Sequence, residues 1–335
     1  MRLPSLICLV LLAASTGTGS LEAQSHLMGP SLGFTPDNSG TAIRRIIGVP
    51  GASLLADRLQ LETEIRGALI SPKHDYAIAV RTEDAQFVVI DLRAGSPTVE
   101  PPAGSHAGAD LMAISPAGRS AAAYAHDSKT IQVIGNLPAA PELVRELDAT
   151  QIPGRATSIA ISDDASIALV RFVYEDRAVL WVINSAGAAL PIGVDQPSAA
   201  AFFPNSANAI VADDASGSAY LFLDVANAGT RIPLTSPATG GMRLFSSAAV
   251  SDDGRRVFLA EVNSGNVAIV DMETLQSTVL SCQCQATGLY RLKGTSVFRL
   301  NETSREPMMV LDASTAEPRI VLVPPRASEI VEAQQ

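Results

Sequence analysis

Short acidic loops are the most frequent polar feature of this 335-residue sequence, and each of these loops separates two apolar runs. Carboxylates gathered on one face would form an acidic rim that attracts a basic partner or a cation. Ordinary solvated turns in an acidic protein explain the same residues more simply. We therefore treat the acidic residues of these loops as candidates for binding and nothing more. They are Glu83, Asp84, Asp127, Glu175, Asp176, Asp213, Asp214 and Glu261. A further loop of this kind, NETSRE, adds Glu302.

Two adjacent aspartates, Asp252 and Asp253, lie in a turn that a glycine follows. Both residue types suit tight turns, because aspartate hydrogen-bonds its own backbone and glycine tolerates a positive φ. A special site would need the pair in one segment alone, yet the residue types at this turn vary along the chain. Comparable turns hold Pro72-Lys73, Pro116-Ala117, Asp163-Asp164, Pro204-Asn205 and Leu292-Lys293. The pair is predicted to be a bend and not a site.

Cysteine and histidine are scarce in the chain. Cys282 and Cys284 could close a small disulfide ring, bind a soft metal or cycle as a redox pair. We favour a disulfide that pins the loop, because no basic neighbour is present to lower a thiol pKa. His106 and His126, with Asp127, could share a metal, but their spacing matches no ligand motif. We therefore predict no metal site.

Sequence motifs for catalysis are absent: there is no Gly-x-Ser-x-Gly elbow, no phosphate-binding loop and no dinucleotide fingerprint. We assign no catalytic residue and no cofactor, and we favour a role other than catalysis. Aromatic residues make up 4% of the chain, and the net charge is −10. Few rings and an acidic surface argue against nucleic acid and membranes as partners.

These residues are positioned by a layout that recurs about every 44 residues. Strings such as ALISPKHDYAIAV and AAVSDDGRRVFLA contain an apolar run, a polar turn and a second apolar run. The first residue of each turn marks the repeat, at Ser71, Ser115, Ser162, Phe203, Ser251 and Arg291. A third run such as FVVIDL or VAIVDM ends in an acid or amide, and a shorter fourth run follows. Such runs, bounded by turn residues, predict four strands in each repeat.

This layout resembles the blades of a β-propeller of the WD-repeat-like, bacterial YVTN-like kind, over residues 67–325. The turn of the SDDGRRVFLA type and the aspartate that ends the third run carry the resemblance. The Gly-His and Trp-Asp pairs of true WD repeats are missing, and Trp181 is the only tryptophan. The resemblance implies an all-β ring in which each blade stacks on its neighbours.

The number of blades depends on the N-terminal segment, residues 25–66. Residues 32–50 predict one more outer hairpin, with Asp37 in the place of the aspartate that ends the third run. Residues 52–59 or the C-terminal tail could supply a further strand. We predict six to seven four-stranded blades and favour seven with one irregular blade. The resemblance also implies that the ring closes by joining the N- and C-terminal strands.

Residues 1–24 have the order of a secretory signal peptide: Arg2, then an apolar run over residues 6–14, then small polar residues before a cleavage point at Ala23 or Gln24. The mature protein is therefore expected in the periplasm or outside the cell, as a monomer. Its expected parts are the N-terminal segment, the propeller over 67–325 and a tail over 326–335.

The favoured function is an exported binding or protein-interaction scaffold, whose partner is an unknown protein or small ligand. The first alternative is a propeller enzyme, lactonase-like or another hydrolase, with its site at the acidic loops. The second alternative is a structural subunit of a cell-envelope assembly, which a contiguous exposed apolar patch would indicate.

Overall fold

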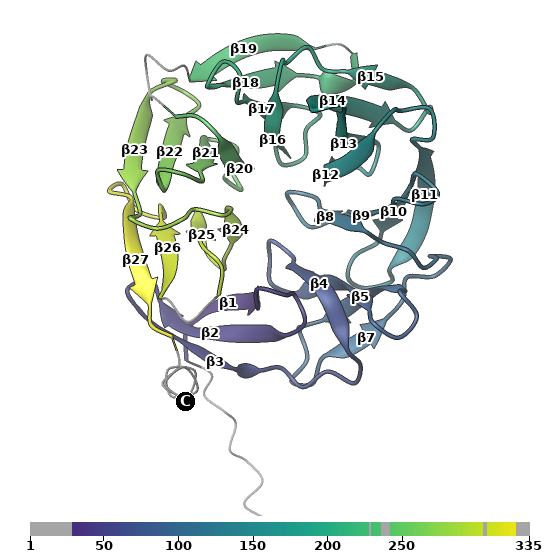
Figure 1. Cartoon of the computed structure of the whole chain (residues 1–335). Helices are drawn as coiled ribbons and strands as arrows, with labels where there is room; N and C mark the ends of the chain where they lie inside the picture. Colours follow the sequence, from purple (N-terminus) through teal and green to yellow (C-terminus); the bar gives the residue numbers. More distant parts are fainter. Residues whose placement is uncertain (1–28, 228, 236–241, 304–306, 326–335) are drawn as a thin grey trace, which may run out of the picture.

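Figure 1 shows a computed structural model of the chain, in which seven β-sheets are arranged as a ring. The structure describes residues 29–227, 229–235, 242–303 and 307–325, so the predicted signal peptide and tail lie outside it. Within these residues the helical content is the single 3-10 turn η1 (Val225–Asn227), and no helix is long and apolar enough to cross a membrane. Six sheets have four strands, and one has three. The fold is a seven-bladed β-propeller. The prediction of seven blades with one irregular blade is confirmed.

Each sheet is built from consecutive strands, and we number the sheets as blades 1 to 7 in chain order. Blade 1 contains β1 (Ser31–Pro36), β2 (Ile43–Val49) and β3 (Ala52–Arg58). Blade 2 contains β4 (Ile65–Ile70), β5 (Tyr76–Arg81), β6 (Phe87–Asp91) and β7 (Thr98–Glu100). Blade 3 contains β8 (Leu111–Ile114), β9 (Ala121–Ala125), β10 (Thr130–Gly135) and β11 (Glu142–Asp148). Blade 4 contains β12 (Arg155–Ile161), β13 (Ile167–Tyr174), β14 (Arg177–Asn184) and β15 (Ala189–Pro191). Blade 5 contains β16 (Pro197–Phe202), β17 (Ala209–Asp213), β18 (Ser218–Leu223) and β19 (Thr230–Thr235). Blade 6 contains β20 (Phe245–Val250), β21 (Arg256–Glu261), β22 (Asn266–Asp271) and β23 (Ser277–Ser281). Blade 7 contains β24 (Tyr290–Arg291), β25 (Val297–Arg299), β26 (Met308–Asp312) and β27 (Arg319–Val323).

The composition of each strand matches its distance from the axis of the ring. The innermost strands β16 (PSAAAF) and β20 (FSSAAV) are rich in small residues, which lets them converge (Figure 1). Middle strands such as β17 (AIVAD) are buried along their whole length, because neighbouring blades cover both of their faces. The outer strand β11 (ELVRELD) alternates between exposed and less exposed side chains, as expected for a strand at the rim.

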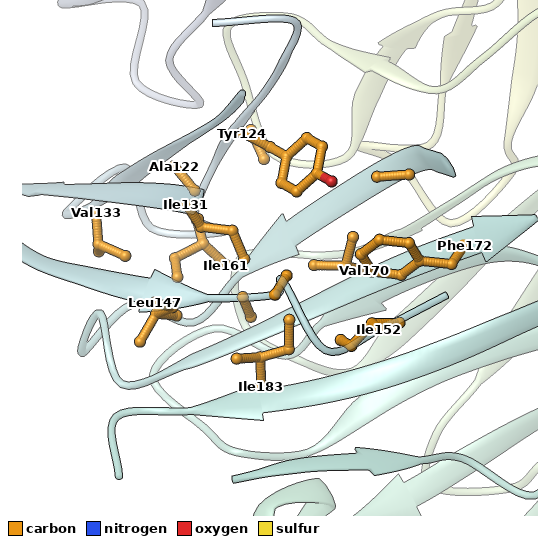
Figure 2. Packing of buried hydrophobic residues seen from close by; sticks show 14 of the residues in the cluster. Ala122, Tyr124, Ile131, Val133, Leu147, Ile152, Ile161, Val170, Phe172 and Ile183 are labelled. Atoms are coloured by element: carbon orange, nitrogen blue, oxygen red, sulfur yellow. The ribbon is translucent and has the colours of Figure 1, made fainter. Parts of the chain in front are cut away.

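The hydrophobic core lies between the blades and not within any one of them. Figure 2 shows the interface of blades 3 and 4, where Tyr124, Ile131 and Leu147 from blade 3 face Ile161 and Phe172 from blade 4. The rings of Tyr124 and Phe172 meet edge to face, with their centroids 6.1 Å apart. A single blade cannot bury both of its faces, so this stacking holds the ring together.

The ring does not close in the way that the resemblance implied. Blade 1 contains strands from the N-terminal end of the chain only, and blade 7 contains strands from the C-terminal end only, within the described residues. The predicted hairpin over residues 32–50 forms β1 and β2, and β1 is the innermost strand of its blade in Figure 1, where an outer hairpin was expected. The other predicted strand, over residues 52–59, is β3.

Backbone and side-chain groups of the two flanking blades take the place of the fourth strand of blade 1. From blade 7, the Lys293 N–H donates to the Leu32 carbonyl at 2.7 Å. From blade 2, His74 Nδ1 accepts a hydrogen bond from the Phe34 N–H at 2.9 Å. The open edge of β1 is thus paired without a shared strand, which removes the cost of unpaired buried backbone groups.

Glycine at position 33 is required by this closure. Gly33 has a φ of 101°, and a Cβ atom built there would lie 2.4 Å from His74 Nδ1. No larger residue fits without moving the ring of His74 away from β1.

Candidate functional site

The loops that carry the predicted acidic residues lie beside the connections between blades. The Gly108 N–H of one connection donates to the Ala85 carbonyl of a loop, and the Cys282 N–H donates to the Gly265 carbonyl in the same manner. We call the surface formed by these loops and connections the loop face.

Four of the eight predicted acidic side chains serve local structure on the loop face. Asp213 accepts hydrogen bonds from the Gln196 N–H and from Ser216, and Asp214 accepts one from the Phe245 N–H of the next blade. Glu261 likewise accepts hydrogen bonds from the Arg243 N–H and the Ser264 hydroxyl. Asp84 pairs with Arg81 in its own turn, and this hydrogen-bonded pair lowers the pKa of Asp84 to about 2. These carboxylates therefore already hold backbone, hydroxyl or arginine donors of the fold.

The other four predicted side chains, Glu83, Asp127, Glu175 and Asp176, are exposed and spread over blades 2 to 4. Glu175 and Asp176 form the two-residue turn between β13 and β14, with φ values of 47° and 63°. Among the described residues, no three His, Cys, Asp or Glu side chains converge as a metal site would require. The structure therefore places the eight residues on one side of the ring without bringing them together.

The turns on the opposite side of the ring use their paired aspartates in two different ways. Asp253 accepts hydrogen bonds from the Ser251 hydroxyl and the Arg255 N–H, and the bond from Ser251 lowers the pKa of Asp253. This residue is the predicted bend. Asp252 instead forms an ion pair with Arg291 of blade 7, so it also ties two blades together.

The predicted histidine and cysteine groups also have structural partners. His106 Nε2 lies 2.5 Å from Glu146, whereas the ring of His126 packs edge to face on Tyr124 with the centroids 5.3 Å apart, so the two rings have different partners. The sulfur atoms of Cys282 and Cys284 form a disulfide, with the two Cα atoms 5.1 Å apart. Cys282 is buried between blades 6 and 7.

A pocket lies where the ring closes, and residues of β1, β4 and β24 line it. Figure 1 shows these three strands at the inner edge of the ring. The pocket has a volume of about 340 Å³, and residues of blades 1, 2 and 7 line it. We call it the closure pocket. Its lining residues are Phe34, Thr35, Pro36, Asp37, Asn38, Ser39, Gly40, Gly67, Ala68, Leu69, Ile70, Leu289, Tyr290, Arg291, Leu292, Arg299 and Glu302.

Arg299 is the most unusual residue of the closure pocket. Its side chain is 1% exposed, and burial lowers the pKa of its guanidinium, although arginine keeps its charge in proteins. The guanidinium lies 4.0 Å from the centre of the Tyr290 ring, and its Nη1 donates to the Pro36 carbonyl at 3.4 Å. Both contacts are with lining residues, so the cation belongs to the wall of the pocket.

A second polar group in the pocket belongs to the last blade. The Tyr290 hydroxyl donates to Glu302 Oε1 at 3.0 Å, and burial raises the pKa of Tyr290, which keeps this donor protonated. Thr287 donates to the same oxygen at 3.3 Å. The other carboxylate in the wall, Asp37, accepts four hydrogen bonds within its own turn. Glu302 therefore offers the more available oxygen, Oε2.

Sequence reasoning missed Arg299 because the repeat was aligned one residue too early in blade 7. The turns of the other blades begin with a hydrogen bond such as that of the Ser71 N–H to the Tyr76 carbonyl, and in blade 7 the matching bond joins Leu292 to Val297. The marker is therefore Leu292 and not Arg291. In this register, Arg299 occupies a buried column that elsewhere holds Ile78, Ala122, Leu169, Ile210 and Phe258. A charged residue at a repeat position that is apolar in the other blades is the sequence feature that indicates Arg299.

Comparisons with known proteins add no functional assignment. No family model and no curated protein matches the chain. A functionally unknown protein from Desulfotomaculum acetoxidans has a similar crystal structure, with a TM-score of 0.57, 15% identity and coverage of 88% of this chain and 100% of that chain. The Kuenenia stuttgartiensis hydrazine synthase is similar with a TM-score of 0.51, 12% identity and coverage of 91% of this chain and 98% of that chain. These likenesses show the fold alone.

We expect calcium and zinc to leave the thermal unfolding midpoint of residues 25–335 unchanged. The acidic side chains of the loop face are either saturated by backbone and hydroxyl donors or spread apart, so neither ion gains several ligands at once. Thermal scans with each ion and with a chelator measure this. A rise of several degrees with either ion would contradict the expectation and favour the enzyme alternative.

Proposed function

We propose that this chain is an exported β-propeller that acts as a binding scaffold and takes a small ligand in the closure pocket. The observation that carries the proposal is the pocket itself, about 340 Å³ in volume and built from three blades at the irregular point of the ring. A concave site with a mainly apolar lining and a few convergent polar groups is typical of small-molecule binding.

The chemistry of the pocket supports binding over catalysis. A lactonase-like hydrolase would need several metal ligands at one place. The pocket wall contains two carboxylates, and Asp37 is saturated by its own turn. Glu302 shares its Oε1 with Tyr290 and Thr287, so among the described lining residues it is one positioned carboxylate without a second free carboxylate to act with it.

A ligand screen with a blocked pocket tests this proposal. We expect at least one member of a panel of small acids, amines, sugars and lactones to raise the thermal midpoint of residues 25–335. A bulky side chain at the mouth, Ser39→Trp, should abolish the response, because Ser39 is an exposed lining residue. The matched control is Ser96→Trp, at an exposed serine between β6 and β7 that does not line the pocket.

Two outcomes of the screen oppose the proposal. No response to any member of the panel would refute a small-ligand role for the pocket, and so would an equal response in Ser39→Trp. Turnover of a lactone by the same preparation would establish the enzyme alternative in its place.

The outer rim favours a second candidate, a structural subunit of an assembly. Leu54 on β3 and Leu322 on β27 are about half exposed, at 55% and 54%. Their strands are neighbours at the closure, since a Cβ atom at Gly51, beside β3, would lie 3.8 Å from Val321. Exposed apolar side chains on adjacent strands are typical of protein contacts. Light scattering of the mature chain and of Leu322→Glu would show whether this rim holds copies together.

A further inference from the structure

We infer that the closure pocket binds a small molecule with one carboxylate on an apolar body, and that Arg299 recognises the carboxylate. The inference rests on the proposed function, because it names the chemical class of the ligand in the same pocket. It is carried by a buried cation that the rest of the described chain leaves without an ionic partner.

The hydrogen-bonding capacity of Arg299 is largely unused. A guanidinium has five N–H donors in a planar fork, and such buried donors are paired in most native structures. With the described residues, Arg299 forms one hydrogen bond, from Nη1 to the Pro36 carbonyl, and its length of 3.4 Å lies beyond the usual range. Nε is buried and has no hydrogen-bond partner among the described residues. A carboxylate in the pocket would accept two of these donors side by side.

The charge of Arg299 is also uncompensated by an ion pair. No carboxylate of the described residues lies within 4.0 Å of its guanidinium nitrogens; the guanidinium instead contacts the Pro36 carbonyl and the face of the Tyr290 ring. Glu302 attracts the guanidinium from a greater distance. Burying a cation in this way is unfavourable unless a partner is supplied. A bound carboxylate would be that partner.

The same wall limits the ligand to a single negative charge. Arg291, the other cation of the pocket, is already bound to Asp252 and to the Val250 carbonyl. A phosphate or dicarboxylate would bring a second charge toward Glu302, and the described lining residues supply no second free cation to meet it. The remaining lining is more apolar than polar: it includes Phe34 and Leu289, with Thr35, Asn38 and Ser39 on one side. A monocarboxylate with an apolar body therefore fits the pocket best.

The repeat pattern indicates that Arg299 is not needed for packing. Five other blades hold an apolar residue at this buried position, from Ala122 to Phe258 in size. The residue that pairs with Arg299 on the innermost strand β24 departs from the pattern as well: Tyr290 stands where blades 3 to 6 have alanine. Two paired positions of blade 7 thus differ from the other blades, and both face the pocket.

The test compares hexanoate with its neutral isostere hexanamide by isothermal titration calorimetry and thermal shift, using residues 25–335. We expect hexanoate to bind the wild type at least tenfold more tightly than hexanamide does. Arg299→Met should lose this preference while keeping an unchanged or higher thermal midpoint without ligand. Arg299→Lys keeps the charge but loses the fork, and should weaken hexanoate binding several-fold. The control is Arg145→Met, on the outer strand β11, which should bind as the wild type does.

A second variant keeps the inference testable even if Arg299→Met does not fold. Glu302→Gln retains an acceptor for Tyr290 but removes the negative charge, so hexanoate binding should strengthen several-fold. Equal affinity for hexanoate and hexanamide would overturn the inference, and so would an Arg299→Met protein that keeps the preference. If neither probe binds but another ligand gives a response that Ser39→Trp abolishes, the carboxylate inference fails and the proposed function stands. If nothing binds, both fail.

Discussion

Lowering the pH from 7 to 5 should reduce the free energy of unfolding by about 2 kcal/mol through His74 alone. His74 is 6% exposed, and its pKa is lowered from 6.5 to about 4, mainly by burial, with a smaller contribution from the charges of Lys293 and Arg291. The neutral ring accepts the Phe34 N–H at Nδ1, which assigns its proton to Nε2.

The sign of this effect follows from the direction of the pKa shift. The unfolded chain binds the His74 proton more tightly than the folded chain does, so protons favour unfolding. The contribution of the neutral ring is fully present above pH 6.5, declines between pH 6.5 and 4, and is lost below that range. The full loss, near pH 4 and below, is about 3 kcal/mol.

The substitution His74→Asn isolates this contribution, and urea unfolding at several pH values is the measurement. In the variant, the side-chain oxygen of asparagine can accept the Phe34 N–H, and asparagine tolerates the φ of 57° at this position. As the pH falls, the unfolding free energy of the wild type should therefore decrease more than that of His74→Asn. His126→Asn, at a less buried histidine, is the control. Parallel pH profiles for wild type and His74→Asn would contradict the prediction.

Asp163→Ala should destabilise the protein by about 4 kcal/mol, since each hydrogen bond to a charged group contributes about 1.5–3 kcal/mol. Asp163 is 7% exposed and lies in the first turn of blade 4. One carboxylate oxygen accepts the Ala117 N–H of blade 3 at 2.7 Å, and the other accepts the Asn205 N–H of blade 5 at 2.7 Å. Alanine leaves both N–H groups without this acceptor and removes the hydrogen bonds by which blade 4 is joined to blades 3 and 5 at this turn.

Urea unfolding at pH 7 measures this loss. Asp127→Ala is the matched control, because Asp127 is exposed on the loop face and the same substitution there should change the unfolding free energy by less than about 0.5 kcal/mol. Asp163→Asn keeps one acceptor and should fall between the two. A similar stability for Asp163→Ala and Asp127→Ala would show that the turn aspartate does not hold neighbouring blades.

The propeller could be predicted from the sequence because strand formation here is local and repeated. Alternating apolar runs and turn residues such as Asp253 and Gly254 are visible without tertiary information, and they recur in six blades. The three-stranded blade could not be predicted in the same way. Its missing strand is replaced by His74 and Lys293, and neither residue is near β1 in the sequence.

The candidate site was hidden for the same reason. The acidic residues were conspicuous by composition, yet Asp213 and Glu261 are saturated by backbone N–H groups that only the fold brings near. The closure pocket is assembled from Phe34, Ala68 and Arg299, which lie on three blades and far apart in the chain. The repeat could have pointed to Arg299, but only after its register was shifted by one residue.

The way in which the ring closes determines how the number of blades in such a chain can change. Among the residues that the structure describes, every sheet comes from one uninterrupted stretch of sequence, including the sheets at the two ends. Duplicating or deleting one such stretch would therefore add or remove an entire blade without splitting any sheet between distant parts of the gene. The contacts that close the ring, made by His74 and by the Lys293–Leu32 hydrogen bond, would then have to form again only where blade 1 meets its two neighbours.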